Sequence, residues 1–334
     1  MTGRDEHNIL LLDSLEIGYS SGKKSYSLLP PLSASSKGGE LIAVIGRNGI
    51  GKSTMLRTLA GLQPSLGGDV IINGKSIREY SRLELAKRTG YISTEVVRVS
   101  NMSVFDLVSL GRFPHTNWLG TAGHGDHMSV ENSIARTGLS DLRNRNISEI
   151  SDGERQKAMI ARVLAQNTDF MIMDEPTAFL DIAGKYGIVS LLMKLAADGK
   201  TIIFSTHDFT IALNHADKIW LLLDDRLVEG APEDLVSEGA FENLFESSVV
   251  KFNSGDGAFS FMTEKRGVIY LEGQGLVRKW TEKALLRAGF VLTDSRTDPY
   301  IKITGNPEAK WILVSGGRTE GFRSLYDLAR KLRK

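Results

Sequence analysis

The sequence predicts an α/β fold, in which a parallel sheet wrapped by helices carries an antiparallel β portion and is followed by a small α+β domain. Short apolar runs rich in branched side chains occur at residues 41–45, 170–173 and 201–204, which is typical of buried parallel strands. Residues 52–60 and 186–197 have helical spacing between such runs. Asn73-Gly74, directly after the apolar residues 70–72, is a hairpin signal and indicates the antiparallel portion.

Two domains are expected along the chain. Residues 8–248 form the first, in which residues 81–162 are mostly helical and predict a helical subdomain. A turn cluster at residues 253–257 marks a change of character, and we place the boundary at 248/249. In residues 249–334, strand-like runs at 259–262, 268–271, 300–303 and 311–314 and helical patterns at 277–288 and 322–332 predict the α+β domain. The sequence does not show the role of this second domain.

Composition excludes several classes of function and site. The 334 residues carry 41 basic and 40 acidic side chains, so the overall charge gives no case for nucleic acid as the main partner. Cysteine is absent, which excludes disulfides, thiolate metal sites and a cysteine nucleophile. Apolar runs stay far below the roughly 18 residues of a membrane-spanning helix, and no signal-peptide core is expected near the N-terminus. We therefore expect any role at a membrane to depend on a partner.

A phosphate-binding loop lies between the first predicted strand and helix. Its pattern, G-x-x-x-x-G-K-[ST], reads Gly46-Arg47-Asn48-Gly49-Ile50-Gly51-Lys52-Ser53. The glycines let successive backbone N–H groups turn inward, and the helix adds its positive N-terminal end. We expect Lys52 to reach the β- and γ-phosphates of ATP, Ser53 to ligate Mg²⁺, and Thr54 to bind the α-phosphate.

Two carboxylates end the apolar strand at residues 170–173. Asp174 is expected to hold Mg²⁺ through water, and Glu175 to act as general base or to orient the attacking water. An acidic pair after a strand is often only a solvated loop. Together with the phosphate loop, however, the pair predicts hydrolysis of the nucleotide and not binding alone.

Between these two motifs the chain reads Ile150-Ser151-Asp152-Gly153-Glu154-Arg155-Gln156. This segment resembles the signature motif of ATP-binding cassette (ABC) proteins, and the resemblance covers roughly residues 8–248. It implies a P-loop NTPase core of the RecA-like type with an antiparallel β subdomain and a helical subdomain. It also implies a head-to-tail homodimer, in which Ser151, Gly153 and the helix start near Glu154 contact ATP held by the other subunit. From the residues alone, Ser151 and Glu154 also predict a capping box, and both interpretations can hold at once.

The same resemblance assigns three further residues. His207, after the strand at residues 201–204, matches the switch histidine that bonds the γ-phosphate. Asp181 matches the loop that passes between subunits and is expected at the interface. Tyr19 matches the aromatic residue on which adenine stacks, although core packing is the alternative.

One position departs from the family pattern. Where the family has a glutamine that bonds Mg²⁺ and links the site to the membrane subunit, this chain reads Tyr91-Ile92-Ser93-Thr94-Glu95. Thr94 aligns best by spacing, whereas Glu95 offers a carboxylate oxygen for the metal. The sequence leaves the choice between Thr94 and Glu95 open.

The stretch Leu110-Gly111-Arg112-Phe113-Pro114-His115, with Trp118 and Gly120 after it, resembles ATPases of importers for iron siderophores, haem and vitamin B12. Local packing of His115 and Trp118 is the alternative. The resemblance implies a peripheral subunit on the cytoplasmic face of the inner membrane, with integral membrane permease subunits as partners and, indirectly, a substrate-binding protein. A soluble ABC ATPase without a membrane partner and a nucleotide-gated regulatory module are the competing functions. The cargo is not encoded in this chain.

Overall fold

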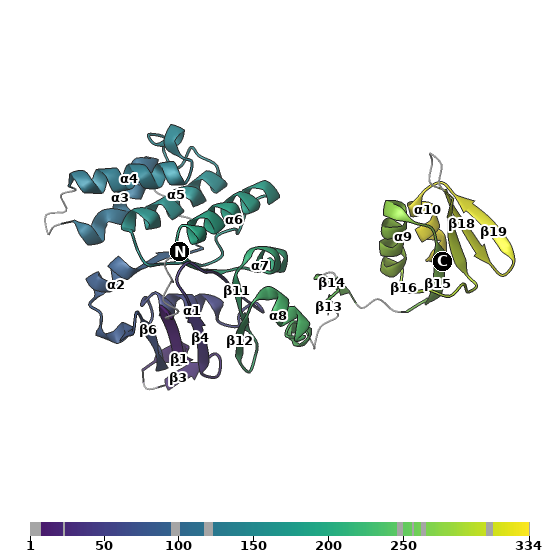
Figure 1. The fold of residues 1–334 in the computed structure, drawn as a ribbon, viewed down its shortest axis with the longest axis horizontal. Helices are drawn as coiled ribbons and strands as arrows, with labels where there is room; N and C mark the ends of the chain where they lie inside the picture. The colour runs from purple at the N-terminus through teal and green to yellow at the C-terminus, as the bar shows by residue number, and fades with distance from the viewer. Residues whose placement is uncertain are drawn as a thin grey trace, which may run out of the picture. The chain divides into compact units, whose positions relative to one another are not determined.

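The computed structural model describes residues 8–22, 24–94, 101–116, 123–245, 250–255, 257–261, 265–304 and 310–333. The chain divides into two compact units, the first comprising residues 1–246 with 252–258 and the second residues 247–251 with 259–334 (Figure 1). Each unit has its own hydrophobic core. Among the described helices, none combines the length and the apolar character needed to cross a membrane.

A six-stranded sheet forms the centre of the first unit, in the order β12-β11-β5-β10-β9-β8. The strands are β5 (Leu41–Gly46), β8 (Thr89–Ile92), β9 (Phe170–Met173), β10 (Thr201–Ser205), β11 (Lys218–Leu222) and β12 (Leu227–Gly230). All neighbours pair in parallel except β12, which runs antiparallel to β11. Every residue of β5, β9 and β10 is buried, which explains why these strands read as continuous apolar runs.

An antiparallel sheet covers one face of this centre, in the order β4-β1-β6-β7. It contains β1 (Leu10–Glu16), β4 (Leu32–Ser36), β6 (Gly67–Ile72) and β7 (Lys75–Ser76). Asn73 and Gly74, at φ 49° and 76°, make the tight turn between β6 and β7 that the sequence predicts. A second hairpin joins β2 (Gly18–Ser21) to β3 (Lys24–Ser27). Buried side chains of α1 (Lys52–Leu59), such as Leu56, share one core with Leu12 of β1 and Trp220 of β11.

Helices cover the other face. They are α3 (Val104–Ser109), the 3-10 segment η2 (Leu110–His115), α4 (His124–Arg136), the 3-10 turn η3 (Ser140–Leu142) and α5 (Asp152–Gln166). Helix α2 (Arg82–Arg88) instead packs Leu85 against the core that α1 and β1 share. In Figure 1, α3, α4 and α5 gather on the side of the first unit opposite β1, β4 and β6. β8 lies within the same sequence range as these helices but belongs to the central sheet. Helices α6 (Ile182–Ala197), α7 (Phe209–His215) and α8 (Pro232–Ser237) and the turn η4 (Glu242–Phe245) complete the unit.

A short hairpin, formed by β13 (Val250–Asn253) and β14 (Ala258–Phe261), has residues in both units. Phe252 of β13 packs against the core of the first unit, with its ring centroid 5.1 Å from that of Phe241. The turn cluster predicted at residues 253–257 therefore lies between two strands. The first of these, β13, is held to the first unit by the contact of Phe252 with Phe241.

The second unit is a five-stranded sheet with two helices, in the strand order β16-β15-β17-β18-β19. Its elements are β15 (Gly267–Glu272), α9 (Gly275–Arg287), β16 (Phe290–Thr293), β17 (Tyr300–Thr304), β18 (Lys310–Ser315), β19 (Arg318–Phe322) and α10 (Leu325–Leu332). Leu285 of α9 and Leu328 of α10 share a core with Ile269, Ile301 and Leu313 of the strands, so both helices pack on one face of the sheet.

The last predicted helix needs correction at its start. Phe322 ends strand β19, opposite Trp311 of β18, and α10 begins only at Leu325. The side chain of Phe322 nevertheless reaches the same core as Leu325, which is why it extends the helical pattern by one member. Strands β16 and β19 were not predicted.

Candidate functional site

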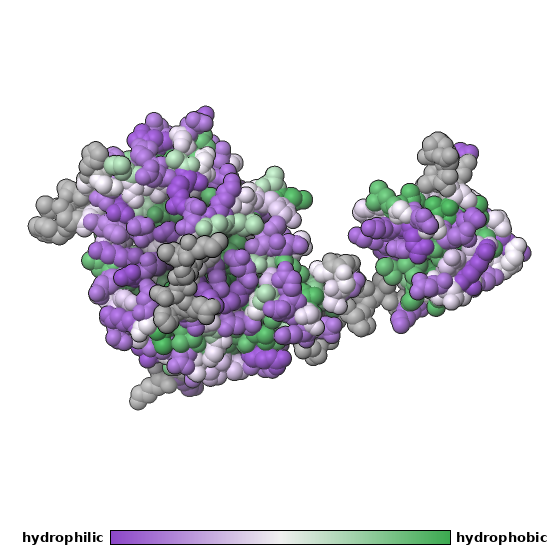
Figure 2. Space-filling model, in the orientation of Figure 1, coloured by the Kyte–Doolittle hydropathy of each residue, from purple (hydrophilic) through white to green (hydrophobic). Residues whose placement is uncertain are grey.

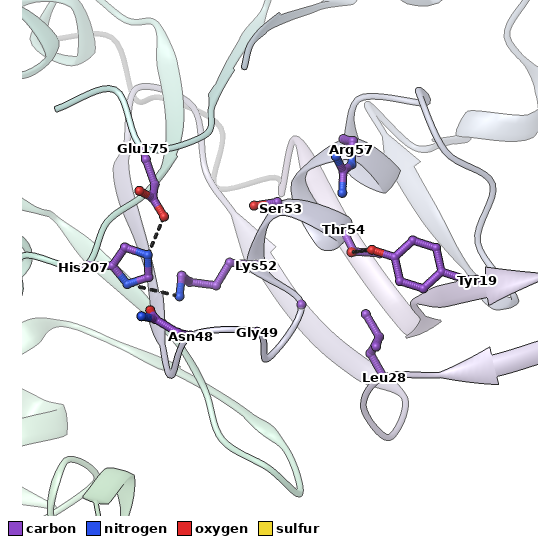
Figure 3. A pocket seen from close by; sticks show the side chains of 11 residues that line it. Tyr19, Leu28, Asn48, Gly49, Lys52, Ser53, Thr54, Arg57, Glu175 and His207 are labelled. Atoms are coloured by element: carbon purple, nitrogen blue, oxygen red, sulfur yellow. Dashed lines mark hydrogen bonds and ion pairs between the residues drawn. The ribbon is translucent and has the colours of Figure 1, made fainter. Parts of the chain in front are cut away.

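The loop between β5 and α1 forms the floor of a pocket of about 390 Å³. Gly49 and Gly51 have φ values of 78° and 114°, which side-chain-bearing residues rarely adopt, and Gly51 caps the N-terminus of α1. The pocket is lined by Tyr19, Leu28, Asn48, Gly49, Gly51, Lys52, Ser53, Thr54, Arg57, Glu175 and His207 (Figure 3). Strand, loop and helix thus present backbone N–H groups and a positive helix end to one cavity.

Lys52 lies at the bottom of the pocket and is 6% exposed. Its Nζ donates to the carbonyl oxygens of Gly46 at 2.9 Å and Arg47 at 3.1 Å. Burial lowers the pKa of the Lys52 ammonium, and the carboxylates of Glu175 and Asp174 oppose that effect. The lysine is therefore held inside the phosphate loop by the loop's own backbone.

One buried hydroxyl holds the Asp174 carboxylate and the backbone of Glu175 after β9. Ser205, at the end of β10 and 0% exposed, donates to Asp174 Oδ1 at 2.7 Å, and its Oγ accepts the backbone N–H of Glu175 at 2.8 Å. Glu175 has φ 49°, which turns the chain sharply after the strand. β10 lies between β5 and β9, so this serine connects the acidic strand end to the strand next to the phosphate loop.

His207 joins the carboxylate side of the pocket to the lysine side. Its Nε2 contacts Glu175 Oε1, and its Nδ1 lies 3.5 Å from Lys52 Nζ. Figure 3 shows the imidazole between the two side chains. Three residues that are far apart in the sequence thus form a chain of polar contacts across the pocket.

At the other end of the pocket, Tyr19 and Thr54 share a hydrogen bond between their hydroxyls, 2.8 Å apart. Tyr19 is 50% exposed on the β2–β3 hairpin, so it is not a core residue. Leu28 and Arg57 also line the pocket, and neither carries a separate signal in the sequence. The ring of Tyr19 and the side chain of Leu28 supply apolar surface beside a polar floor (Figure 3).

The predicted signature residues do not line this pocket. Ser151 and Glu154 form a capping box at the start of α5: Ser151 N donates to Glu154 Oε2 at 2.8 Å, and Glu154 N donates to Ser151 Oγ at 3.3 Å. The helix begins at Asp152, and a Cβ added at Gly153 would meet no other atom within 4 Å. Within one chain, these three residues therefore stand apart from the phosphate loop.

Thr94 is close to the acidic strand end but makes a backbone contact. Its Oγ1 donates to the carbonyl oxygen of Asp174 at 3.1 Å, and it is not among the pocket-lining residues. Glu95 and Trp118 lie outside the described residues. His115 packs locally, with Nε2 2.8 Å from the carbonyl oxygen of Gln166.

The donor set suits Mg²⁺ better than a metal with a full protein cage. No group of three or more His, Cys, Asp or Glu side chains with metal-binding geometry occurs in the described part of the chain. Mg²⁺ usually takes one or two protein ligands and completes its shell with water and substrate phosphates. Ser53 in the pocket and Asp174, 6% exposed at the strand end, offer such a partial set.

Comparisons with known proteins agree with this geometry. Residues 29–178 match the family model described as ABC transporter, and residues 265–333 match the model described as iron ABC transporter C-terminal domain. The ferric enterobactin transport ATP-binding protein FepC of Escherichia coli is 34% identical over 235 residues, which cover 70% of this chain and 85% of FepC.

Two further relatives extend the comparison. The iron(3+)-hydroxamate import ATP-binding protein FhuC of Bacillus subtilis is 36% identical over 210 residues, covering 63% of this chain and 75% of FhuC. The dimeric structure of the ATP-binding cassette MJ0796 bound to ADP and Pi has a TM-score of 0.58 and 26% identity, and covers 67% of this chain and 98% of that chain. The predicted α/β fold of the P-loop NTPase type is confirmed. The chain therefore belongs to the ATP-binding, ATP-hydrolysing proteins of the ABC transporter family.

Proposed function

We propose that this chain drives import of an iron chelate or cobalamin-type cargo by binding and hydrolysing ATP beneath a membrane permease. The convergence of Lys52, Glu175 and His207 on the phosphate-loop pocket carries the hydrolytic part of this proposal. The transport part rests on relatives that are named for ferric enterobactin and iron-hydroxamate transport, and on the match of residues 265–333 to an iron transporter domain.

In this mechanism the phosphate loop holds the substrate. Lys52 binds the β- and γ-phosphates, and the backbone of Gly46, Asn48, Gly49 and Gly51 donates to phosphate oxygens. Thr54 bonds the α-phosphate, and adenine stacks on Tyr19, whose ring is exposed beside Thr54. The polar end of the pocket thus receives the phosphates and the apolar end the base.

The carboxylates and His207 organise hydrolysis. Glu175 accepts a proton from the attacking water, and His207, in contact with Glu175, bonds the γ-phosphate and keeps the water in line. Ser53, and Asp174 through water, would hold Mg²⁺, with Thr94 and Glu95 as the open choice for a further ligand. Mg²⁺ supplies positive charge to the phosphates when it is bound.

A head-to-tail homodimer completes each site with the other subunit's Ser151, Gly153 and Glu154. Their absence from the pocket lining within one chain supports this arrangement, because ATP in that pocket would meet such residues only on a second copy. Near Asp181, which caps α6, Phe179 is 81% exposed and Ile182 is 76% exposed. Neighbouring exposed apolar side chains of this size are typical of an interface.

The permease is proposed to dock on the helical subdomain. Phe113 and Leu110 of η2 are 75% and 53% exposed beside a pocket of about 220 Å³, whose wall includes Phe105 and the ion pair Arg112–Asp126. This surface offers an apolar contact with a polar edge for a short helix of a membrane subunit. The location that follows is the cytoplasmic face of the inner membrane, with a substrate-binding protein as an indirect partner.

The test is ATP turnover by the purified chain beside the variant Glu175→Gln. We expect a loss of about 10²–10⁴-fold in turnover with ATP binding retained, and an ATP-dependent dimer on size exclusion. The matched control is Glu238→Gln, an exposed carboxylate on the end of α8, which should leave turnover unchanged. Equal turnover by both variants would exclude Glu175 as the base. If the unmutated chain neither hydrolyses ATP nor forms an ATP-dependent dimer, even with its permease present, the function of a nucleotide-gated regulatory module would be favoured.

Partner capture separates the importer from a soluble ABC ATPase. The affinity-tagged chain, purified from native membranes in detergent, should bring down integral membrane subunits, and Phe113→Asp should reduce their yield without changing ATP binding. Retention of no membrane protein by the parent chain would favour the soluble ATPase.

A further inference from the structure

The second unit carries more basic than acidic side chains, whereas the first unit carries more acidic than basic ones. Residues 259–334 contain 15 Lys and Arg but only 8 Asp and Glu, whereas the 258 residues before them contain 26 and 32. The near-neutral net charge of the whole chain is therefore the sum of a basic small domain and a larger acidic one. Such an asymmetry points to a partner with a negatively charged surface.

The two helices of this unit carry the same pattern on their exposed sides. On α9, Trp280 is followed by Lys283 and Arg287. On α10, Tyr326 is followed by Arg330 and by Arg333, the residue that caps the C-terminus of the helix. The spacings of three or four and then seven residues place each set on one line of its helix. Trp280 is 57% exposed and Tyr326 is 73% exposed. Both helices pack on the same face of the sheet, so each contributes an aromatic side chain and two cations to the outer surface of this helical layer.

The acidic side chains on these helices are already engaged. Glu282 accepts from Arg278 at 2.8 Å, and Asp327 accepts from Ser324 at the start of α10 at 2.7 Å. Among the cations, Lys331 pairs outside the helices, with Glu320 of β19 at 2.7 Å.

Several cations of the helical layer are not neutralised by a carboxylate. Lys279, Arg287 and Arg330 are exposed and make no ion pair in the described part of the chain. Lys283 lies over the ring of Trp280 at 5.2 Å from its centroid. The layer therefore offers cations beside aromatic rings and not a neutralised surface.

We propose that the α9–α10 layer binds the anionic surface of a lipid bilayer. Trp and Tyr prefer the boundary between headgroups and acyl chains, and neighbouring Lys and Arg bind anionic headgroups. Leu276 and Leu286 of α9 are 71% and 52% exposed. Burying these apolar side chains in the interface of a bilayer is favourable, whereas a nucleic acid backbone offers them no apolar contact. Where Figure 1 draws α9, Figure 2 shows apolar residues directly beside hydrophilic ones. This role is additional to ATP hydrolysis and does not depend on the cargo.

The experiment is co-sedimentation of the full chain with phosphatidylcholine vesicles that contain either no or 30 mol% (about one third) phosphatidylglycerol. We expect binding only to the anionic vesicles, and weaker binding as salt rises. Neutralising one surface cation should weaken binding about five-fold, so Lys279→Gln/Lys283→Gln/Arg287→Gln should weaken it by roughly 100-fold. The matched control, Lys265→Gln/Arg318→Gln/Arg323→Gln, removes the same charge outside the helical layer and should retain most of the affinity.

Tryptophan quenching and ATP turnover test the membrane-binding proposal further. Brominated lipid should quench tryptophan fluorescence of the parent, and Trp280→Phe should remove most of that quenching. ATP turnover, measured on the same preparations, should equal the parent's in all these variants, which separates this proposal from the ATPase assignment. Equal binding to both vesicle types, equal loss in the two triple variants, or binding of a DNA or RNA duplex in place of vesicles would overturn the proposal.

Discussion

Ser205→Ala is the sharpest test of how the two carboxylates are held. The Ser205 hydroxyl is fully buried, donates to Asp174 Oδ1 and accepts from the Glu175 N–H. Removing it deletes one hydrogen bond to a charged group, worth about 1.5–3 kcal/mol, and leaves the part-buried Glu175 N–H without its acceptor, at about 1–3 kcal/mol. Relaxation of the neighbours recovers part of this sum, so we expect a loss of about 2–4 kcal/mol in the free energy of unfolding. Turnover should fall about 10- to 100-fold, because misplacing a catalytic group by about 1 Å has that cost.

The assay is urea unfolding followed by circular dichroism, together with ATP turnover at saturating nucleotide. The matched control is Thr58→Val, which removes a buried hydroxyl that donates to the carbonyl oxygen of Thr54 within α1. Because no donor is orphaned there, we expect a loss of about 1 kcal/mol and normal turnover. A Ser205→Ala protein that unfolds like Thr58→Val and hydrolyses ATP at the parental rate would refute the reasoning.

The remaining predictions concern packing in the two units. Gly111→Ala places a Cβ 2.0 Å from the carbonyl oxygen of Arg162, so we expect the free energy of unfolding, measured by thermal denaturation, to fall by about 2 kcal/mol or more. Gly187→Ala in α6, where nothing lies within 4 Å of the added Cβ, should instead raise the free energy of unfolding by about 0.5–1 kcal/mol. A loss in Gly187→Ala equal to that in Gly111→Ala would argue against the contact with Arg162 as the cause. In the second unit, Thr281→Val leaves the buried Trp311 N–H without its acceptor at 2.8 Å and should cost about 1–3 kcal/mol, while Thr281→Ser should cost less. Near-ultraviolet circular dichroism of the full chain would follow this change, and equal melting of the two Thr281 variants would contradict it.

Much of the fold was readable because its signals are local. Residues 41–45, 170–173 and 201–204 fall within β5, β9 and β10, and Asn73-Gly74 makes the predicted turn. Buried parallel strands are apolar on both faces, and this signal survives without knowledge of the neighbours. The phosphate loop was equally readable, because the residues that form it are contiguous in the chain.

Features that depend on neighbours were harder to predict. Ser205 gains its importance from β9, which pairs with β10 and brings the Asp174 carboxylate and the Glu175 N–H to it. In the sequence it is an ordinary polar residue at a strand end. Strand β19 has exposed polar residues and an edge position, so it lacks apolar alternation. Gly316 and Gly317, at φ 57° and 72°, were the signal that could have indicated the hairpin leading into it.

The separation of the α5 capping box from the phosphate pocket has a consequence for mixed assemblies. If each competent site takes its pocket from one copy and its Ser151–Glu154 segment from the other, two differently damaged copies can complement each other. A Glu175→Gln chain paired with a chain altered at Gly153 would place both lesions in one site and leave the second site whole. Hydrolysis by such a mixture, absent from either variant alone, would show that one intact site is enough for ATP turnover.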